Sequence, residues 1–209
     1  MTPQENSQDP LHSPVQEQIW RKVPTTLPLY TEFLVVGGGL SGCAAAISAA
    51  RLGVKVTLLE PTHMLGGQAG PGGVSAMDET AHYEEVVSEF GFWSEFSSRI
   101  KKFYTYRLKR PVNVSQYRDD SFSPNPVVVD RILTLMLKEA GVQVFRNLAL
   151  CDADVRGGNA VVFTSAGRIT GRLVLDATED GCIIRLSNIP HRLGHAVFGL
   201  IPVEGVDGV

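Results

Sequence analysis

A glycine-rich turn between two apolar stretches restricts the fold of this 209-residue chain more than any other feature. Gly37, Gly39 and Gly42 form the pattern G-x-G-x-x-G directly after the apolar run 33–36. Glycines at this spacing allow a tight turn, bring bare main chain close to a pyrophosphate, and let the following helix pack closely on the strand. The helix also directs its unbonded N–H groups and the positive end of its dipole at the same place. The pattern therefore predicts a strand–turn–helix unit that binds a diphosphate.

An acidic residue closes this unit. A second strand is expected over 55–59, and Glu60 stands at its carboxyl end. A carboxylate there accepts hydrogen bonds from both hydroxyls of an adenosine ribose, and its spacing from the glycines matches the dinucleotide-binding βαβ fingerprint. An ordinary βαβ unit with a Gly-rich turn is the alternative. A membrane span over 33–50 is disfavoured, because three consecutive glycines and many alanines give a poor transfer energy although the stretch carries no charge.

The composition excludes several classes of function. A net charge of −3 offers no electrostatic basis for binding a polyanion, so no nucleic-acid partner is expected. The three cysteines form no C-x-x-C pair, which argues against disulfides, a zinc site or an iron–sulfur cluster and favours a reducing compartment. His191 and His195 have helical spacing but no third ligand near them in sequence, so no metal is expected. Residues 1–18 contain no apolar signal region, and we expect a cytoplasmic protein with no membrane partner.

The rest of the chain predicts a mixed α/β domain. The expected elements, in chain order, are a Gly-rich loop over 62–77, helical residues over 78–104 broken at Gly91, a proline-containing loop over 104–126, a helix over 130–139, a third parallel strand over 142–145, and a β-meander with strands at 149–155, 159–164 and 168–173. A separate apolar strand ending in Asp176-Ala177-Thr178 would then return beside the first strand. The Gly-rich loop is either a surface connection or main chain held against a flat ligand, and its position after Glu60 favours the second interpretation. No clear element is expected over 183–209.

These stretches together resemble the FAD-dependent oxidoreductases of the glutathione-reductase-like structural class. The resemblance rests on VVGGGLSGCAAAISAARLGVKVTLLEP, on the LGGQ that follows it and on LVLDATEDG after the meander. It covers residues 32 to about 194 and implies an α/β fold: an FAD/NAD(P)-binding, Rossmann-like parallel sheet with a β-meander crossover. Gly66 and Gly67 resemble the FAD-specific extension of the motif, which favours FAD as cofactor. A nicotinamide-binding Rossmann protein is a further alternative.

The resemblance also implies a cofactor site. The residues that would hold the pyrophosphate, the ribose, the path towards the flavin and the adenine are Gly37, Gly39, Leu40, Ser41, Gly42, Glu60, Gly66, Gly67, Gln68, Leu150, Ala177 and Thr178. Glu60 would bind the adenosine ribose, and the backbone near Leu150 would meet the adenine. No catalytic acid or base is assigned.

Two departures from the family pattern bear on function. Cys182 stands where the family has an Asp that bonds the ribityl chain or a phosphate, and the nearby Asp180 would point differently. We expect a disordered leader over 1–29, an FAD-binding domain over 30–195 and an irregular tail over 196–209, without the family's substrate domain. The predicted function is an FAD-binding oxidoreductase, or its FAD-binding part, that moves a hydride or electrons between a small-molecule substrate and flavin. The alternative is a non-catalytic FAD-binding fragment, with the substrate side completed by a partner chain or a homo-oligomer.

Overall fold

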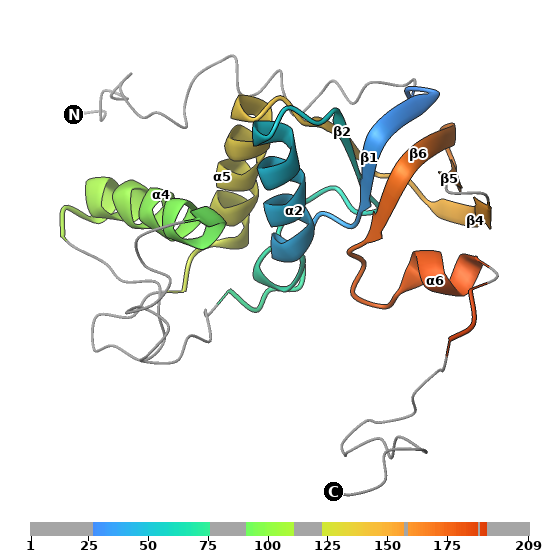
Figure 1. Cartoon of the computed structure of the whole chain (residues 1–209). Helices are drawn as coiled ribbons and strands as arrows, with labels where there is room; N and C mark the ends of the chain where they lie inside the picture. The colour runs from blue at the N-terminus through green and yellow to red at the C-terminus, as the bar shows by residue number, and fades with distance from the viewer. Residues whose placement is uncertain (1–26, 76–90, 111–122, 157–158, 188, 192–209) are drawn as a thin grey trace, which may run out of the picture.

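A single mixed sheet organises the part of the chain that the structure describes. The computed structural model describes residues 27–75, 91–110, 123–156, 159–187 and 189–191. Its elements (Figure 1) are β1 (Tyr30–Val36), α2 (Leu40–Arg51), β2 (Val56–Glu60), the 3₁₀ turn η1 (Gly67–Ala69), α4 (Gly91–Leu108), α5 (Pro126–Glu139), β3 (Gln143–Arg146), β4 (Leu150–Arg156), β5 (Asn159–Thr164), β6 (Gly167–Asp176) and α6 (Cys182–Leu186). Most of the expected leader and the whole of the expected tail over 196–209 lie outside the described residues.

The six described strands lie in the order β3-β2-β1-β6-β5-β4. β3, β2, β1 and β6 are parallel to their neighbours, and β6, β5 and β4 form the antiparallel meander. In the register, Val36 at the end of β1 pairs with Leu59 of β2 and with Asp176 of β6. The carboxyl ends of these three strands therefore meet at one edge of the sheet, where open α/β folds bind their ligands. The predicted fold class is confirmed.

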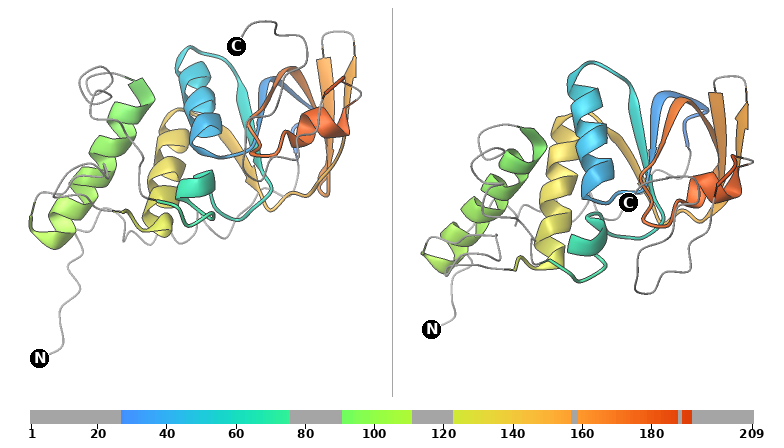
Figure 2. Two further views of the ribbon diagram at one scale, coloured as in Figure 1. Left: turned by 90° about the horizontal axis from the view of Figure 1, so that it is seen from below. Right: turned by 60° about the horizontal axis from the view of Figure 1, so that its bottom comes forward.

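Two apolar cores cover the two faces of the sheet. Side chains of successive strand residues point to opposite faces, and Val35 of β1 accordingly packs into the core shared with α2, α4 and α5. Leu34 and Val36 pack into a second core, which the meander and Ile183 of α6 complete. Figures 1 and 2 show α4, α5 and α2 on one side of the strands and α6 beside the meander on the other. Burial on both faces explains why residues 33–36 of β1 are continuously apolar.

Both helices that flank the predicted loop over 104–126 extend beyond their expected limits. α4 continues to Leu108, and α5 begins at Pro126 rather than at residue 130. The loop prediction was wrong at both ends, because residues 104–108 were assigned to the loop as polar and Pro126 was taken as a helix breaker. At the first helical position its missing N–H has no intrahelical acceptor to lose, and Asn125 caps the helix there. Residues 78–90, the first half of the helical stretch expected over 78–104, lie outside the described residues.

The last strand of the predicted meander and the predicted return strand are one element. β6 pairs antiparallel with β5 and parallel with β1 along its ten residues. Gly171 allows this passage, because a Cβ there would lie 2.8 Å from the Leu34 Cβ. The prediction of two separate strands was wrong, although the expected position beside β1 is confirmed. A short helix, α6, also occupies part of the segment for which no element was expected.

The start of α5 gives a test of this local structure. The Asn125 side-chain oxygen accepts a hydrogen bond from the Val127 N–H at 2.9 Å. We expect Asn125→Ala to lower the free energy of unfolding by about 1 kcal/mol, because this N–H would lose its acceptor. Asn125→Asp keeps an acceptor and should stay within a few tenths of the parent. Urea unfolding of the three proteins measures the difference, and equal losses in both variants would contradict the capping role.

Candidate cofactor-binding site

A cavity of about 400 Å³ lies at the carboxyl edge of the sheet. Four segments line it: the turn after β1, the end of β2 with the residues that follow, the loop around η1, and the segment after β6. The start of β4 contributes Leu150. This is where the topology places a ligand site, since β1 and its two parallel neighbours all end here. The volume lies within the range of small-molecule pockets.

The glycines of the first turn are needed for two different reasons. Gly37 has a φ of +105°, and a Cβ on it would lie 2.4 Å from the Ala177 carbonyl oxygen. A Cβ on Gly42 would lie 2.0 Å from the Gly37 carbonyl oxygen. Gly39 has ordinary extended backbone, and the one described atom within 4 Å of its Cβ position is the Gly67 Cα, at 3.9 Å. The chain itself therefore leaves room beside Gly39, and that room belongs to the cavity.

The N-terminus of α2 borders the same space. Gly39 is its N-cap and provides no side-chain hydrogen bond, and the first turn contains no acidic residue. The first N–H groups of a helix have no intrahelical acceptors, and together with the helix dipole they favour an anion. Leu40, Ser41 and Gly42 lie in this first turn. Their main-chain N–H groups fit a diphosphate placed against Gly39.

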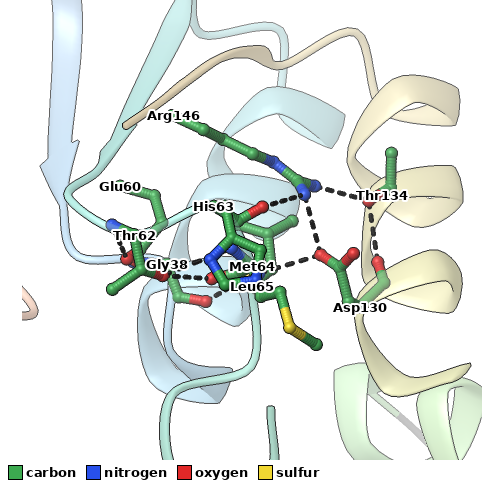
Figure 3. A network of polar contacts seen from close by, with 10 residues as sticks. Gly38, Glu60, Thr62, His63, Met64, Leu65, Asp130, Thr134 and Arg146 are labelled. Carbon is green, nitrogen blue, oxygen red and sulfur yellow. Dashed lines mark hydrogen bonds and ion pairs between the residues drawn. The ribbon is translucent and has the colours of Figure 1, made fainter. Parts of the chain in front are cut away.

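Glu60 ties the ends of β1 and β2 together. It is 7% exposed, and its Oε2 accepts a hydrogen bond from the Gly38 N–H at 2.7 Å. Its Oε1 accepts another from the Thr62 N–H, also at 2.7 Å (Figure 3). Each carboxylate oxygen can accept more than one hydrogen bond. Glu60 therefore holds the turn in place and keeps capacity for ligand hydroxyls.

The second glycine pair lies against the first glycine turn. The Gly66 N–H donates to the Gly38 carbonyl oxygen at 2.8 Å, and Gly66 pairs with Gly39 in an isolated parallel bridge. Gly66 and Gly67 have φ angles of +108° and +55°, in the region where glycine is favoured. Gly67 lines the cavity, and Gly66 is buried. The interpretation of this loop as main chain held beside a ligand site fits this arrangement.

A buried ion pair holds the segment that links Glu60 to these glycines. Asp130 of α5, which is 2% exposed, accepts hydrogen bonds through Oδ1 from the Leu65 N–H and from Arg146, both at 2.8 Å. Arg146 also donates to the His63 carbonyl oxygen at 3.1 Å and to the Thr134 hydroxyl at 2.5 Å (Figure 3). Sequence reasoning missed this pair. The available signal was a charged residue at a core position of the apolar stretch VVVDRILTLML.

The energetics of this pair indicate a role in geometry more than in stability. Burial raises the pKa of Asp130 above its ordinary value, and the Arg146 guanidinium opposes that shift only in part. The attraction between the two groups therefore does not recover the whole cost of removing the carboxylate from water. What the pair provides is a defined path for residues 62–65, from the buried carboxylate of Glu60 to the second glycine pair.

Side-chain hydrogen bonds fix the segment after β6. The Asp176 carboxylate accepts from the Thr178 N–H at 3.1 Å and from its hydroxyl at 2.6 Å. The Thr178 hydroxyl accepts in turn from the Cys182 N–H at 2.8 Å. Burial raises the pKa of Cys182, and the nearby Asp180 adds to the shift, so its thiol is neutral at neutral pH. Asp180 forms an ion pair with Arg185.

Seven of the twelve predicted cofactor residues line the cavity together. They are Gly37, Gly39, Glu60, Gly67, Leu150, Ala177 and Thr178. Leu40, Ser41, Gly42, Gly66 and Gln68 do not line it, and Ser41 and Gln68 are exposed. The lining residues that the sequence prediction missed are Gly38, Pro61, Thr62, Pro71, Gly72, Glu179, Asp180 and Cys182. Several of them are immediate neighbours in sequence of predicted residues, and this adjacency was the signal that could have identified them.

Two further searches cover only the described ranges of the chain. Within them, no group of three or more His, Cys, Asp or Glu side chains is arranged to hold a metal ion. His191 is exposed, and His195 lies outside these ranges. None of the helices there is both long enough and apolar enough to cross a membrane.

Comparisons with known proteins identify the family of this chain. The profile of the family described as FAD dependent oxidoreductase matches residues 32–199. The 3-hydroxybenzoate 6-hydroxylase of Klebsiella oxytoca is 48% identical over 188 residues, which cover 83% of this chain and 47% of that protein. The chain thus spans about half the length of this curated relative.

Solved structures show the same fold at low identity. NikD, an unusual amino acid oxidase essential for nikkomycin biosynthesis, has a TM-score of 0.50 and 15% identity, covering 76% of this chain and 54% of that one. L-proline dehydrogenase from P. horikoshii has a TM-score of 0.50 and 16% identity, with coverage of 77% and 56%. These similarities concern the architecture alone.

The two roles of the glycines can be separated by substitution. We expect Gly39→Val to fold with an unfolding free energy within about 1 kcal/mol of the parent and to lose dinucleotide binding, because its side chain would enter the cavity. Gly42→Ala should instead destabilise the fold by about 1–3 kcal/mol, since its Cβ would collide with main chain. Thermal unfolding and titration with FAD measure both effects. Retained binding in Gly39→Val would show that the ligand does not approach Gly39.

A double-mutant cycle tests the buried pair. We expect Arg146→Met to cost about 3–5 kcal/mol of stability, because Asp130 would stay buried without its cation. The double variant Asp130→Leu/Arg146→Met should cost less than that single change, which urea unfolding can measure. Arg51→Met is the control, since Arg51 forms an exposed ion pair with Glu95 worth at most about 1 kcal/mol. Additive losses in the cycle would contradict the coupling.

Proposed function

The chain belongs to the FAD-dependent oxidoreductases, and on this premise we propose that its cavity holds FAD for electron transfer with a small-molecule substrate. The observation that carries the proposal is the combination of bare main chain at Gly39 with the buried carboxylate of Glu60. When bound, the flavin supplies the acceptance and release of a hydride or an electron pair. The chain's own residues bind the cofactor and exclude water from it.

The cavity offers a different kind of contact for each part of the cofactor. The N–H groups at the start of α2, beside Gly39, suit the diphosphate. Glu60 suits the hydroxyls of the adenosine ribose, as an acceptor with unused capacity. Leu150 also lines the cavity and offers an apolar surface for the adenine. Ala177 and Thr178 line the cavity next to Gly37.

Family membership selects FAD over the nicotinamide alternative. The choice between a complete enzyme and a cofactor-binding fragment depends on the substrate side. We propose that substrate contacts come from residues beyond the described ranges, from a partner chain or from a second copy of this chain. The relative named as 3-hydroxybenzoate 6-hydroxylase makes small aromatic acids the first substrates to test.

The proposal also includes the organisation and location of the protein. It places the FAD-binding domain at residues 30–195, between a leader and a tail. A cytoplasmic location is supported by unpaired cysteines, which suit a reducing compartment.

Spectroscopy of the purified chain tests the central claim that the cavity holds FAD. Flavin absorbance that bleaches with an anaerobic reductant supports it, and a colourless protein that takes up no added FAD overturns it. Bound flavin without turnover of any candidate substrate favours the fragment.

Glu60 provides the sharpest mutational test. We expect Glu60→Ala to weaken FAD binding by about 1–3 kcal/mol, or about 5- to 150-fold in Kd, because the ribose hydroxyls and the glycine turn would lose an acceptor. Glu32→Ala is a matched control. Glu32 also accepts a main-chain N–H, that of Lys55 at 2.9 Å, but lies at the amino end of β1. Fluorescence titration of the apoprotein with FAD measures both, and equal affinities in the two variants would remove Glu60 from this role.

A further inference from the structure

The side chain of Glu179 reaches the point where the two glycine stretches meet. A Cβ built on Gly67 would lie 2.8 Å from the Glu179 Oε1 and 3.1 Å from the Gly39 Cα. Glu179 comes from the segment after β6, so three parts of the chain converge here. Glu179 also lines the cavity. The carboxylate therefore occupies the space that the missing side chain of Gly67 leaves open.

Glu179 differs from the other carboxylates after β6 in having no partner in the described part of the chain. Asp176 accepts hydrogen bonds from Thr178 and from the Ile184 N–H at 3.0 Å. Asp180 is paired with Arg185. No hydrogen bond or ion pair of Glu179 occurs within the described ranges. Glu179 is exposed and lines the cavity, so its carboxylate can accept a hydrogen bond from a ligand there.

The charge of the cavity restricts which part of a ligand Glu179 can meet. Among the described residues, no Lys or Arg lines the cavity. A carboxylate repels a diphosphate and attracts a hydroxyl or an N–H donor. A diphosphate therefore belongs beside the N-terminus of α2, and a hydrogen-bond donor belongs beside Glu179.

Two carboxylates, those of Glu60 and Glu179, lie beside neighbouring glycines of the turn. Glu60 contacts Gly38, because a Cβ on Gly38 would lie 2.9 Å from its Oε2. Glu179 lies at the junction of Gly39 and Gly67. FAD has the matching order of groups: a ribose with hydroxyls, a diphosphate, and a ribityl chain with hydroxyls. A diphosphate held at the turn directs one set of hydroxyls to each carboxylate.

We propose that Glu179 is the residue that accepts a hydrogen bond from the ribityl chain of FAD. The inference rests on the proposed function, because it takes FAD as the occupant of the cavity. Cys182 stands where the resembling family has an Asp that bonds the ribityl chain or a phosphate. Glu179 would supply the carboxylate that this chain lacks at position 182. The role of Glu179 is to bind and position the cofactor.

The test compares FAD with ADP, which shares the adenosine diphosphate half and lacks the ribityl chain. The full chain, stripped of flavin, is titrated with each compound by calorimetry, as parent, Glu179→Ala, Glu179→Gln and Glu32→Gln. We expect Glu179→Ala to raise the Kd for FAD about tenfold, a value for loss of a charge-assisted hydrogen bond. The Kd for ADP should not rise. Glu179→Gln keeps an acceptor oxygen and should lie between parent and Glu179→Ala.

Glu32→Gln removes the same charge from a residue at the amino end of β1 that does not line the cavity, and it should leave the ratio of FAD to ADP affinity unchanged. An unchanged ratio in Glu179→Ala would overturn the inference, as would tighter binding of both compounds, which would indicate simple repulsion. Equal weakening for both compounds would also overturn it, because the contact would then lie in the shared half. If the parent binds neither compound, the proposed function itself fails. Thermal unfolding of each variant checks that it is folded.

Discussion

The buried carboxylate of Glu60 is the contact on which the site depends. It accepts main-chain hydrogen bonds from Gly38 after β1 and from Thr62 after β2. Two loops that leave the sheet at neighbouring strand ends are thereby held at a set separation. A charged acceptor suits this task, because charge-assisted hydrogen bonds are roughly twice as strong as neutral ones. The same group faces the cavity, so the element that shapes the site also offers it an acceptor.

The second layer of support comes from α5 and β3. Asp130 and Arg146 together bind the main chain at His63 and Leu65, just before the second glycine pair. Burying such a pair contributes little net stability, and the raised pKa of Asp130 agrees with that expectation. Its effect is to select one path for the loop among many that an apolar core would allow. The helix layer thus determines where Gly67 lies relative to Gly39.

The electrostatics of the cavity follow from this arrangement. The attraction for a diphosphate comes from the main chain at the start of α2 and from the helix dipole. The charged side chains that line the cavity in the described residues are carboxylates, and they suit the hydroxyl-bearing parts of a dinucleotide. In the proposed complex, charge on the protein would complement FAD group by group. This division explains how a chain with a net negative charge can serve an anionic cofactor.

The sequence by itself determined the parallel sheet, the glycine turn after β1 and the position of Glu60. These depend on local periodicity and on contacts within one βαβ unit, which neighbouring residues specify. Only the tertiary structure decided that β6 is one strand, because that depends on the close approach of Gly171 to Leu34. It also decided the pairing of Asp130 with Arg146 and the place of Glu179 between two glycines. Such contacts join segments far apart in the chain, and a charged residue in the sequence does not show which backbone it will meet.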